Sequence, residues 1–368
     1  MRLLIAAGGT GGGVYPALSV AQTLMIDGQV VGRAADQLLW IGGLGGMEVG
    51  LITRAGLPFQ AIHGAGVHGV GWRLPLNALN LVRGLIEALG RVRAFRPEVV
   101  LVTGGFITVP VALAAWLNRV PVLVYLPDIE PALAVKAIAA VARRIAVTVE
   151  DSRAYLRGKD VVVTGYPTRP DLTAGSRAAA RLHFGLTDRP ALLVTGGSRG
   201  ARSLNTATLA ALSDWLRDYD VIHLSGESDW PAVEQARAAL PAEQQAHYHA
   251  FPFLHAMGLA LAAADLVVSR AGASALGEYP LFGLPAVLVP YPYAWRYQKV
   301  NADYLVRRGA AVRLADEALG SALAGTVRGL LSDPARLADM RTAARAAATP
   351  EAARHVVREL RQMAGSVA

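Results

Sequence analysis

Two glycine-rich runs, each directly after an apolar segment, are the parts of this sequence best suited to hold an anion. Gly8–Gly13 follows Arg2–Ala7, and Gly196–Gly200 follows Ala191–Thr195. A glycine turn between a strand and a helix lets backbone N–H groups approach a phosphate at the positive end of the helix. Either run alone is explained equally well as a tight structural turn. Val14 breaks the dinucleotide-binding fingerprint and no Gly-Lys-Ser/Thr follows either run, which argues against a nicotinamide-dependent oxidoreductase and a P-loop enzyme.

The second glycine run carries polar side chains that suit a diphosphate. Ser198 can donate to a phosphate oxygen, and Arg199 and Arg202 add positive charge near the start of the following helix. Ser198 could equally cap that helix. The two roles are compatible, so we expect Ser198 to perform both. Such a site needs no metal ion.

Two later segments carry groups that could bind a sugar or a ribose. Glu278 is expected just inside a helix that follows a strand, where a carboxylate is favoured and can accept two hydrogen bonds from a ribose diol. Gln298 lies in an aromatic, proline-rich loop and offers both donors and acceptors to sugar hydroxyls. Glu278 could instead be a charge that stabilises the first turn of its helix, and the aromatic residues around Gln298 could serve only surface packing.

The elements that must position these residues are strands alternating with helices. Continuous apolar strands between helices are typical of a parallel sheet covered on both faces. Helices are predicted at Tyr15–Met25, Leu76–Phe95, Pro131–Val141 and within Ser332–Ala368. The predicted strands are Arg2–Ala7, Gln37–Ile41, Glu98–Val102, Val120–Tyr125, Arg144–Val149, Asp160–Thr164, Ala191–Thr195, Val221–Leu224, Leu266–Ser269 and Ala286–Val289.

The alternation restarts after the polar stretch Arg169–Gly175, which is the best candidate for a linker. We therefore expect an N-terminal domain over 1–168, a second domain over 169–350, and a C-terminal helix over 351–368 that packs back on the first domain. Two doubly wound domains would form a cleft at the carboxyl ends of their sheets.

Composition narrows the class of protein. The chain has 368 residues, of which 53% are hydrophobic and 17% charged, as in a globular α/β protein of two domains. The net charge of +8 suits an anionic partner, but the sequence contains no nucleic-acid-binding module. Without cysteine it has neither a disulfide nor a thiolate metal site. No apolar stretch reaches the roughly 18 residues of a membrane span, so we expect a soluble or peripheral protein.

Four segments in this order resemble the MurG family of UDP-N-acetylglucosamine–N-acetylmuramyl-(pentapeptide) pyrophosphoryl-undecaprenol N-acetylglucosamine transferases: Gly8–Leu18, Gly165–Arg169, Gly196–Asn205 and Arg270–Pro285. The similarity is collinear over nearly the whole chain. It implies an α/β GT-B architecture of two Rossmann-like domains around a cleft. The implied activity is an inverting, metal- and cofactor-independent hexosyl transfer from UDP-N-acetylglucosamine to a lipid-linked muramyl-pentapeptide in peptidoglycan synthesis, by a cytoplasmic protein peripheral to the inner face of the cell membrane.

The resemblance also implies roles for individual residues. Ser198 would hold the diphosphate, Arg169 would lie at the interdomain nucleotide site, and Gln298 would contact the sugar. Phe253 and Leu254 would border the uracil. The remaining positions would bind diphosphate and ribose (Ala273, Ser274, Ala275, Leu276, Gly277 and Glu278) or face the acceptor pyrophosphate or donor sugar (Thr10, Gly11 and Gly12).

The sequence departs from the family pattern mainly on the acceptor side. The histidine that ends the family's first glycine loop is Gly13 here, and the family's His-Glu-Gln-Asn segment is Tyr125–Asp128. The family's Gln-Gln pair becomes Tyr297 and Gln298, and its Asp-Asp pair becomes His255 and Ala256. The donor side is therefore largely kept, and the acceptor and catalytic side is rewritten.

A general base must take the proton of the acceptor hydroxyl. Asp128, Glu130 and His68 are the candidates, although each could also be a loop or capping residue. The rewritten acceptor side leaves two alternative functions open: a related transferase with a different acceptor or UDP-sugar, and a non-catalytic protein that binds nucleotide sugars.

The segment Val67–Arg96 combines apolar residues with five arginines. Such a segment could rest on an anionic membrane surface, where a lipid-linked acceptor lies. An ordinary amphipathic helix packed on the sheet explains the same pattern equally well.

Overall fold

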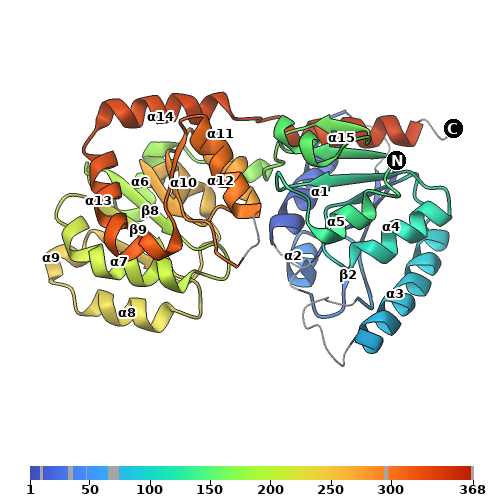
Figure 1. Cartoon of the computed structure of the whole chain (residues 1–368), viewed down its shortest axis with the longest axis horizontal. Coiled ribbons are helices and arrows are strands. Elements are labelled where there is room, and N and C mark those ends of the chain that lie inside the picture. The colour runs from blue at the N-terminus through green and yellow to red at the C-terminus, as the bar shows by residue number, and fades with distance from the viewer. Residues whose placement is uncertain (9–10, 32–35, 47, 65–73, 294–296, 366–368) are drawn as a thin grey trace. The chain divides into compact units, whose positions relative to one another are not determined.

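A computed structural model of the chain describes residues 1–8, 11–31, 36–46, 48–64, 74–293 and 297–365, without the side chains of 28–31 and 74–78. The chain divides into two compact units (Figure 1). Unit 1 contains Met1–Arg169 and the C-terminal segment that begins at Pro350, and unit 2 contains Pro170–Thr349.

Unit 1 is built on a seven-stranded parallel sheet of order β3-β2-β1-β4-β5-β6-β7. Its strands are β1 (Arg2–Ala6), β2 (Gln37–Gly43), β3 (Phe59–Ile62), β4 (Val99–Val102), β5 (Val122–Leu126), β6 (Arg144–Val147) and β7 (Val161–Val163). Its helices are α1 (Gly11–Val31), α2 (Glu48–Arg54), α3 (Leu74–Phe95), α4 (Thr108–Leu117), α5 (Leu133–Ile138), the 3-10 helix η1 (Glu150–Tyr155) and α15 (Ala352–Gly365).

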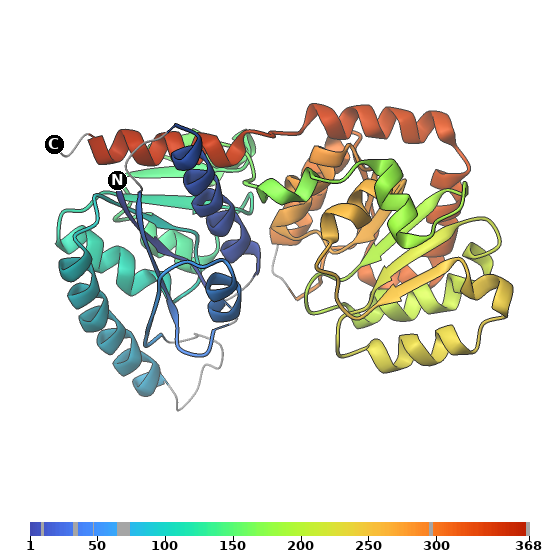
Figure 2. The same ribbon diagram turned by 180° about the vertical axis from the view of Figure 1, so that it is seen from behind.

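Side chains alternate between the two faces of this sheet because successive strand residues point in opposite directions. Leu4 and Ala6 lie in a core cluster with residues of α3, α4 and α5. Leu3 and Ile5 lie in a second cluster with residues of α1 and α15. Figure 2 shows α15 (red) alongside α1 (blue). Helices therefore cover both faces, as a parallel sheet of buried strands requires.

Unit 2 repeats the architecture with six parallel strands of order β10-β9-β8-β11-β12-β13. The strands are β8 (Ala191–Thr195), β9 (Asp220–Leu224), β10 (Tyr248–Phe251), β11 (Leu266–Ser269), β12 (Ala286–Leu288) and β13 (Ala311–Arg313). Its helices are α6 (Arg177–Phe184), α7 (Arg202–Trp215), α8 (Trp230–Ala238), α9 (Ala242–Gln245), α10 (Met257–Ala263), α11 (Glu278–Phe282), α12 (Tyr297–Arg307), α13 (Leu319–Leu331) and α14 (Pro334–Ala346), with 3-10 helices η2 (Pro170–Thr173), η3 (Ala273–Leu276) and η4 (Asp316–Ala318).

The two doubly wound sheets confirm the predicted fold class. The boundaries differ from the predicted ones in a few places: β5 ends at Leu126 and α5 covers only Leu133–Ile138. The predicted C-terminal helical stretch is two helices, α14 and α15, because the chain leaves the helical conformation around Thr349 and Pro350. None of the helices in the described part of the chain is long and apolar enough to cross a membrane.

Candidate functional site

The strand order of each sheet reverses at one point, and open α/β sheets bind their ligands beyond the carboxyl ends of the strands at that point. In unit 1 the reversal lies between β1 and β4, and in unit 2 it lies between β8 and β11. The first glycine run follows β1 and the second follows β8. Both runs, predicted from sequence as anion sites, therefore lie where the topology favours a ligand.

In unit 1 the loops after β1 and β4 contact each other through the backbone atoms of glycines. Gly105 has a φ of 88°, and a Cβ atom added to it would lie 2.5 Å from the carbonyl oxygen of Gly8. Only glycine allows both this conformation and this contact. The close approach places the first turn of α1, which contains Gly11 and Gly12, beside the loop after β4. Thr10 lies outside the described residues.

Gly13, which replaces the family's histidine, is buried in the first turn of α1. A Cβ atom at this position would lie 3.3 Å from the carbonyl oxygen and 3.4 Å from the hydroxyl oxygen of Thr103. The Thr103 side chain is buried, and its hydroxyl has no hydrogen-bond partner among the described residues. A larger side chain at Gly13 would therefore need Thr103 to shift by a few tenths of an ångström.

The loop after β5 carries two of the three candidate bases. Asp128 is half-buried, whereas Glu130 is only 6% exposed. The third candidate, His68, lies outside the described residues. Because a general base must reach the proton of a bound substrate, the greater exposure of Asp128 makes it the better placed of the two described candidates.

Tyr125, which occupies the first position of the rewritten family segment, has a structural role. Its hydroxyl lies 2.8 Å from the hydroxyl oxygen of Thr148 and donates to the carbonyl oxygen of Gly165 at 3.2 Å, so it joins the loops after β6 and β7. Burial raises the pKa of Tyr125, the Thr148 hydrogen bond lowers it in part, and the charge of Asp128 raises it again. Tyr125 therefore stays protonated at neutral pH and does not replace the missing histidine as a base.

Arg169, the last residue of the first segment of unit 1, lies beside the first glycine run. Its guanidinium carbon is 5.5 Å from the centre of the Tyr15 ring, a cation–π distance, and Tyr15 lies one turn after Gly11 on α1. Arg169 therefore lies near the start of α1, where Gly11 and Gly12 are predicted to face the acceptor.

In unit 2 the turn after β8 is also shaped by glycine. Gly200 has a φ of 74°, and a Cβ atom on it would lie 2.1 Å from the carbonyl oxygen of Ser225. Ser198 is exposed at the tip of this turn. The prediction that Ser198 also caps α7 is wrong: the N-cap residue is Ala201, whose side chain cannot accept a hydrogen bond. The turn, closed by the bond from Gly200 N–H to the Gly197 carbonyl at 3.0 Å, ends before the helix begins.

An arginine that the sequence analysis did not single out joins the two loops at the reversal point of unit 2. Arg270, directly after β11, donates to the hydroxyl oxygen of Ser203 on α7 at 2.8 Å and to Asp316 of η4 at 2.5 Å. Its guanidinium also lies 5.4 Å from the Tyr291 ring centre. Its position immediately after an apolar strand, within the segment that resembles the family, was the signal that could have identified it.

A buried polar chain fixes the first turns of α7 against β9. Asn205 donates to the Ser225 carbonyl and to Asp229, both at 2.8 Å, so its amide oxygen accepts from His223 Nε2 at 3.0 Å. The other ring nitrogen of His223 then accepts from the Tyr248 hydroxyl at 2.7 Å. Burial lowers the pKa of His223 to about 4, so the ring is neutral and both nitrogens are satisfied.

The other predicted donor residues lie on neighbouring loops of the same edge of the sheet. Ala273–Leu276 form η3 after β11, Gly277 follows them, and the half-buried Glu278 begins α11 as predicted. Phe253 (exposed) and Leu254 (half-buried) follow β10, two strands from β8.

Gln298 has a structural bond that the sequence did not predict. Its side-chain oxygen accepts the backbone N–H of Tyr291 at 2.8 Å, so that oxygen helps to shape the aromatic loop. Its amino group still suits sugar hydroxyls as a donor.

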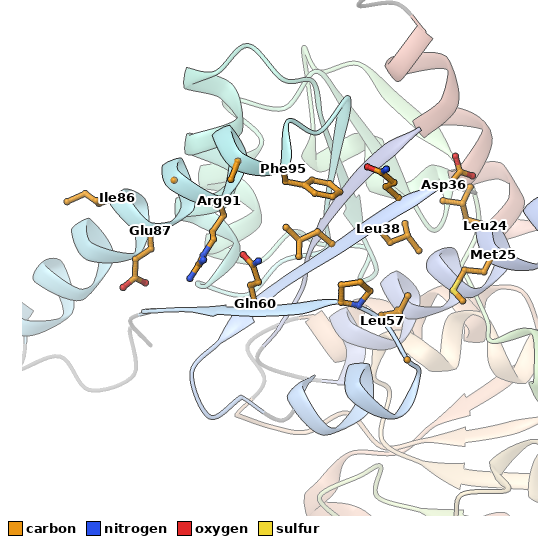
Figure 3. Close-up of a pocket in the computed structure, with 16 residues that line it drawn as sticks. Leu24, Met25, Asp36, Leu38, Leu57, Gln60, Ile86, Glu87, Arg91 and Phe95 are labelled. Atoms are coloured by element: carbon orange, nitrogen blue, oxygen red, sulfur yellow. The ribbon is translucent and has the colours of Figure 1, made fainter. Parts of the chain in front are cut away.

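A groove of about 1140 Å³ on unit 1 lies away from this chemistry (Figure 3). It is lined by the first residues of β2 and β3, by Leu24 and Met25 of α1 and by the last three turns of α3. The predicted site residues of unit 1 lie at the carboxyl ends of the strands, whereas this groove lies at their amino ends. We therefore do not assign the reaction to it.

The comparisons with known proteins agree with each other. The chain matches the glycosyltransferase family 28 N-terminal domain over residues 3–147 and the family 28 C-terminal domain over residues 191–356. It is 41% identical to the UDP-N-acetylglucosamine–N-acetylmuramyl-(pentapeptide) pyrophosphoryl-undecaprenol N-acetylglucosamine transferase of Roseiflexus sp. (strain RS-1), over 96% of this chain and 93% of the relative. The protein of the same name from Desulforudis audaxviator is 36% identical over 99% of each chain. The crystal structure of Acinetobacter baumannii MurG has a TM-score of 0.76 at 27% identity and covers 98% of this chain and 99% of that chain.

Proposed function

Because the chain belongs to glycosyltransferase family 28, and within it to the MurG-type transferases, we propose that it moves N-acetylglucosamine from UDP-N-acetylglucosamine to a lipid-linked muramyl-pentapeptide in peptidoglycan synthesis. Both relatives described above are named for this reaction. That favours it over transfer to another acceptor and over a non-catalytic role.

The observation that carries the proposal is the grouping of the donor residues at one edge of unit 2. Ser198 and η3 follow the two strands that flank the reversal point, and Glu278 begins the next helix. The start of α7, with the Gly196–Gly200 turn before it, would receive the diphosphate, since first-turn N–H groups and the helix dipole favour negative charge. Glu278 would accept hydrogen bonds from the ribose hydroxyls.

The same arrangement would stabilise the departing UDP. Negative charge develops on the diphosphate as the sugar–phosphate bond breaks, and donors already in place lower the barrier without a metal ion. Asp128 of unit 1 would take the proton of the acceptor hydroxyl. The acceptor pyrophosphate would contact the first turn of α1, where Gly11 and Gly12 lie beside the loop after β4.

The lipid-linked acceptor calls for a membrane-facing surface, and α3 of unit 1 is our candidate for a peripheral contact with the inner face of the cell membrane. Leu79, Val82 and Ile86 are 63%, 55% and 65% exposed and recur at helical spacing. Arg83, between them, is also largely exposed and could contact anionic headgroups. The part of the predicted segment before α3, Val67 to Arg73, lies outside the described residues.

A calorimetric titration with UDP-N-acetylglucosamine tests the donor site. We expect the wild-type protein to bind, and Glu278→Gln to weaken binding roughly tenfold or more, because hydrogen bonds to a charged acceptor contribute about 1.5–3 kcal/mol. Glu243→Gln, an exposed glutamate on α9, is the matched control and should bind like the wild type. Absence of binding by the wild-type protein would refute the donor site.

A further inference from the structure

A second pocket of unit 1 gathers arginines at the edge of the sheet opposite the predicted acceptor site. It has a volume of about 950 Å³ and lies beside the first residues of β1, β4 and β5. Its lining includes one carboxylate, Glu98, and five guanidinium groups, from Arg2, Arg93, Arg96, Arg119 and Arg361. The arginines come from β1, from the ends of α3 and α4, and from α15, so the fold brings distant parts of the sequence together here.

The carboxylates around this pocket do not balance its positive charge. Glu98 Oε1 is 3.7 Å from Arg2 Nε, which is buried and has no hydrogen-bond partner in the part of the chain that the structure describes. Arg361 lies 3.6 Å from Asp36. Within the described part of the chain, Arg96 and Arg119 have no carboxylate partner. Five arginines against Glu98 of the lining and Asp36 beside Arg361 leave three positive charges in excess.

The ends of α3 and α4 account for only part of this excess. Basic residues at a helix C-terminus offset its partial negative charge, which is about half an elementary charge per helix. Two helix ends therefore offset roughly one charge, and about two remain. A cluster of like charges with this excess is stabilised by an anion between them.

The backbone of the two central arginines strengthens the case. Arg96 and Arg119 have φ angles of 49° and 60°, and within the described residues they are the only non-glycine residues with positive φ. Each follows the end of a helix, a position where glycine is the usual choice because it adopts this conformation without strain. The chain instead carries arginine at both positions, which places both guanidinium groups in this pocket.

We infer that this pocket binds a phosphate-bearing anion. Guanidinium groups bind phosphate oxygens in pairs, and the remaining excess of positive charge favours a multiply charged phosphate over a singly charged carboxylate or a chloride ion. The phosphate could belong to a soluble molecule or to a lipid headgroup. This pocket is separate from the donor site, so phosphate binding to it does not depend on the proposed reaction.

The test compares the full-length wild-type protein with the double variant Arg96→Gly/Arg119→Gly in a calorimetric titration with inorganic pyrophosphate at low salt. We expect the double variant to lose at least tenfold in affinity. Because glycine relieves the positive-φ strain, its melting temperature should be no lower than that of the wild type, which separates lost binding from lost folding. Arg237→Gln/Arg336→Gln removes the same charge from exposed positions of unit 2 and should bind pyrophosphate like the wild type.

A co-sedimentation assay with phosphatidylglycerol vesicles, with phosphatidylcholine vesicles as the blank, identifies the source of the phosphate. Weaker sedimentation of the Arg96/Arg119 variant than of the control variant would assign the pocket to a lipid headgroup. Equal sedimentation together with weakened pyrophosphate binding would assign it to a soluble phosphate. Equal pyrophosphate affinity in the two double variants would overturn the inference, because the effect would then be one of net charge alone.

Discussion

Asp128 lies on the loop after β5 and Gly13 lies in the first turn of α1, which follows β1, and together they define what is unusual about this transferase. The position that holds histidine in the family has no side chain here and is packed against Thr103. The position that holds asparagine carries a half-buried carboxylate. Tyr125 is buried and forms hydrogen bonds with two neighbouring loops, so its role is structural. Asp128 is therefore the residue to which we assign proton removal.

Replacing Asp128 by asparagine removes the charge but keeps the shape of the side chain. We expect kcat to fall about a hundredfold or more, because general-base catalysis contributes roughly 10² to 10⁴ in rate. The affinity for UDP-N-acetylglucosamine should stay within about twofold, since the donor residues lie on unit 2. Glu130→Gln, on the same loop but buried, is the matched control and should keep most of the activity. The opposite ranking of the two variants would move the base to Glu130.

Residue types were predictable at the site, but their bonding partners were not. The sequence identified Ser198, Glu278 and Gln298 by their chemistry and by their position after apolar strands. It did not reveal that the Gln298 side chain accepts a hydrogen bond from Tyr291. Nor did it reveal that the glycine turn ends before α7, so that Ser198 does not cap this helix. These depend on backbone angles at glycines such as Gly200, which sequence patterns do not specify.

At the scale of elements, the strands missed from the sequence share one property. β3, β10 and β13 all lie at an edge of a sheet. Edge strands are flanked on one side only and tolerate polar residues such as Gln60, His249 and Arg313, so their apolar signal is weak. The central strands, which are largely apolar and are buried apart from Arg2 at the start of β1, were all predicted.

The junction between α7 and β9 should depend on pH because it contains a buried neutral histidine. His223 has its pKa lowered to about 4 by burial, below the 6.5 expected in the unfolded chain. Between these values the unfolded state binds more protons, so stability is lost as the pH falls from 6.5 to 4, by roughly 3 kcal/mol. Denaturant unfolding at several pH values checks this. His223→Gln, which does not titrate, should show a shallower decline over that range, and an identical decline would contradict the assignment.

At the scale of the whole molecule, the C-terminal helix belongs to the unit that contains the N-terminus. Val356, Val357, Leu360 and Met363 of α15 lie in the core cluster of unit 1. Arg144 on β6 donates to Glu359 at 2.6 Å, and a hydrogen bond of 3.1 Å links His355 with the carbonyl oxygen of Thr164. The chain therefore passes from unit 1 to unit 2 and back, and α15 closes unit 1.

Leu360 is fully buried, so its replacement by alanine should destabilise unit 1 by about 2–5 kcal/mol through the lost contacts and the cavity left behind. The donor site on unit 2 should still bind UDP-N-acetylglucosamine below the new melting temperature. Gln362→Ala, exposed on the same helix, is the control and should leave the melting temperature within a degree or so of the wild type. A similar decrease in melting temperature for both variants would contradict the placement of Leu360 in the core of unit 1.

The most direct test of the proposed reaction is acceptor-dependent release of UDP. The purified protein is mixed with UDP-N-acetylglucosamine, and UDP is followed before and after addition of a lipid-linked muramyl-pentapeptide. We expect release to depend on the acceptor and to produce a disaccharide-bearing lipid, with Asp128→Asn strongly impaired. Donor binding without release in the presence of that acceptor would contradict the proposed transfer.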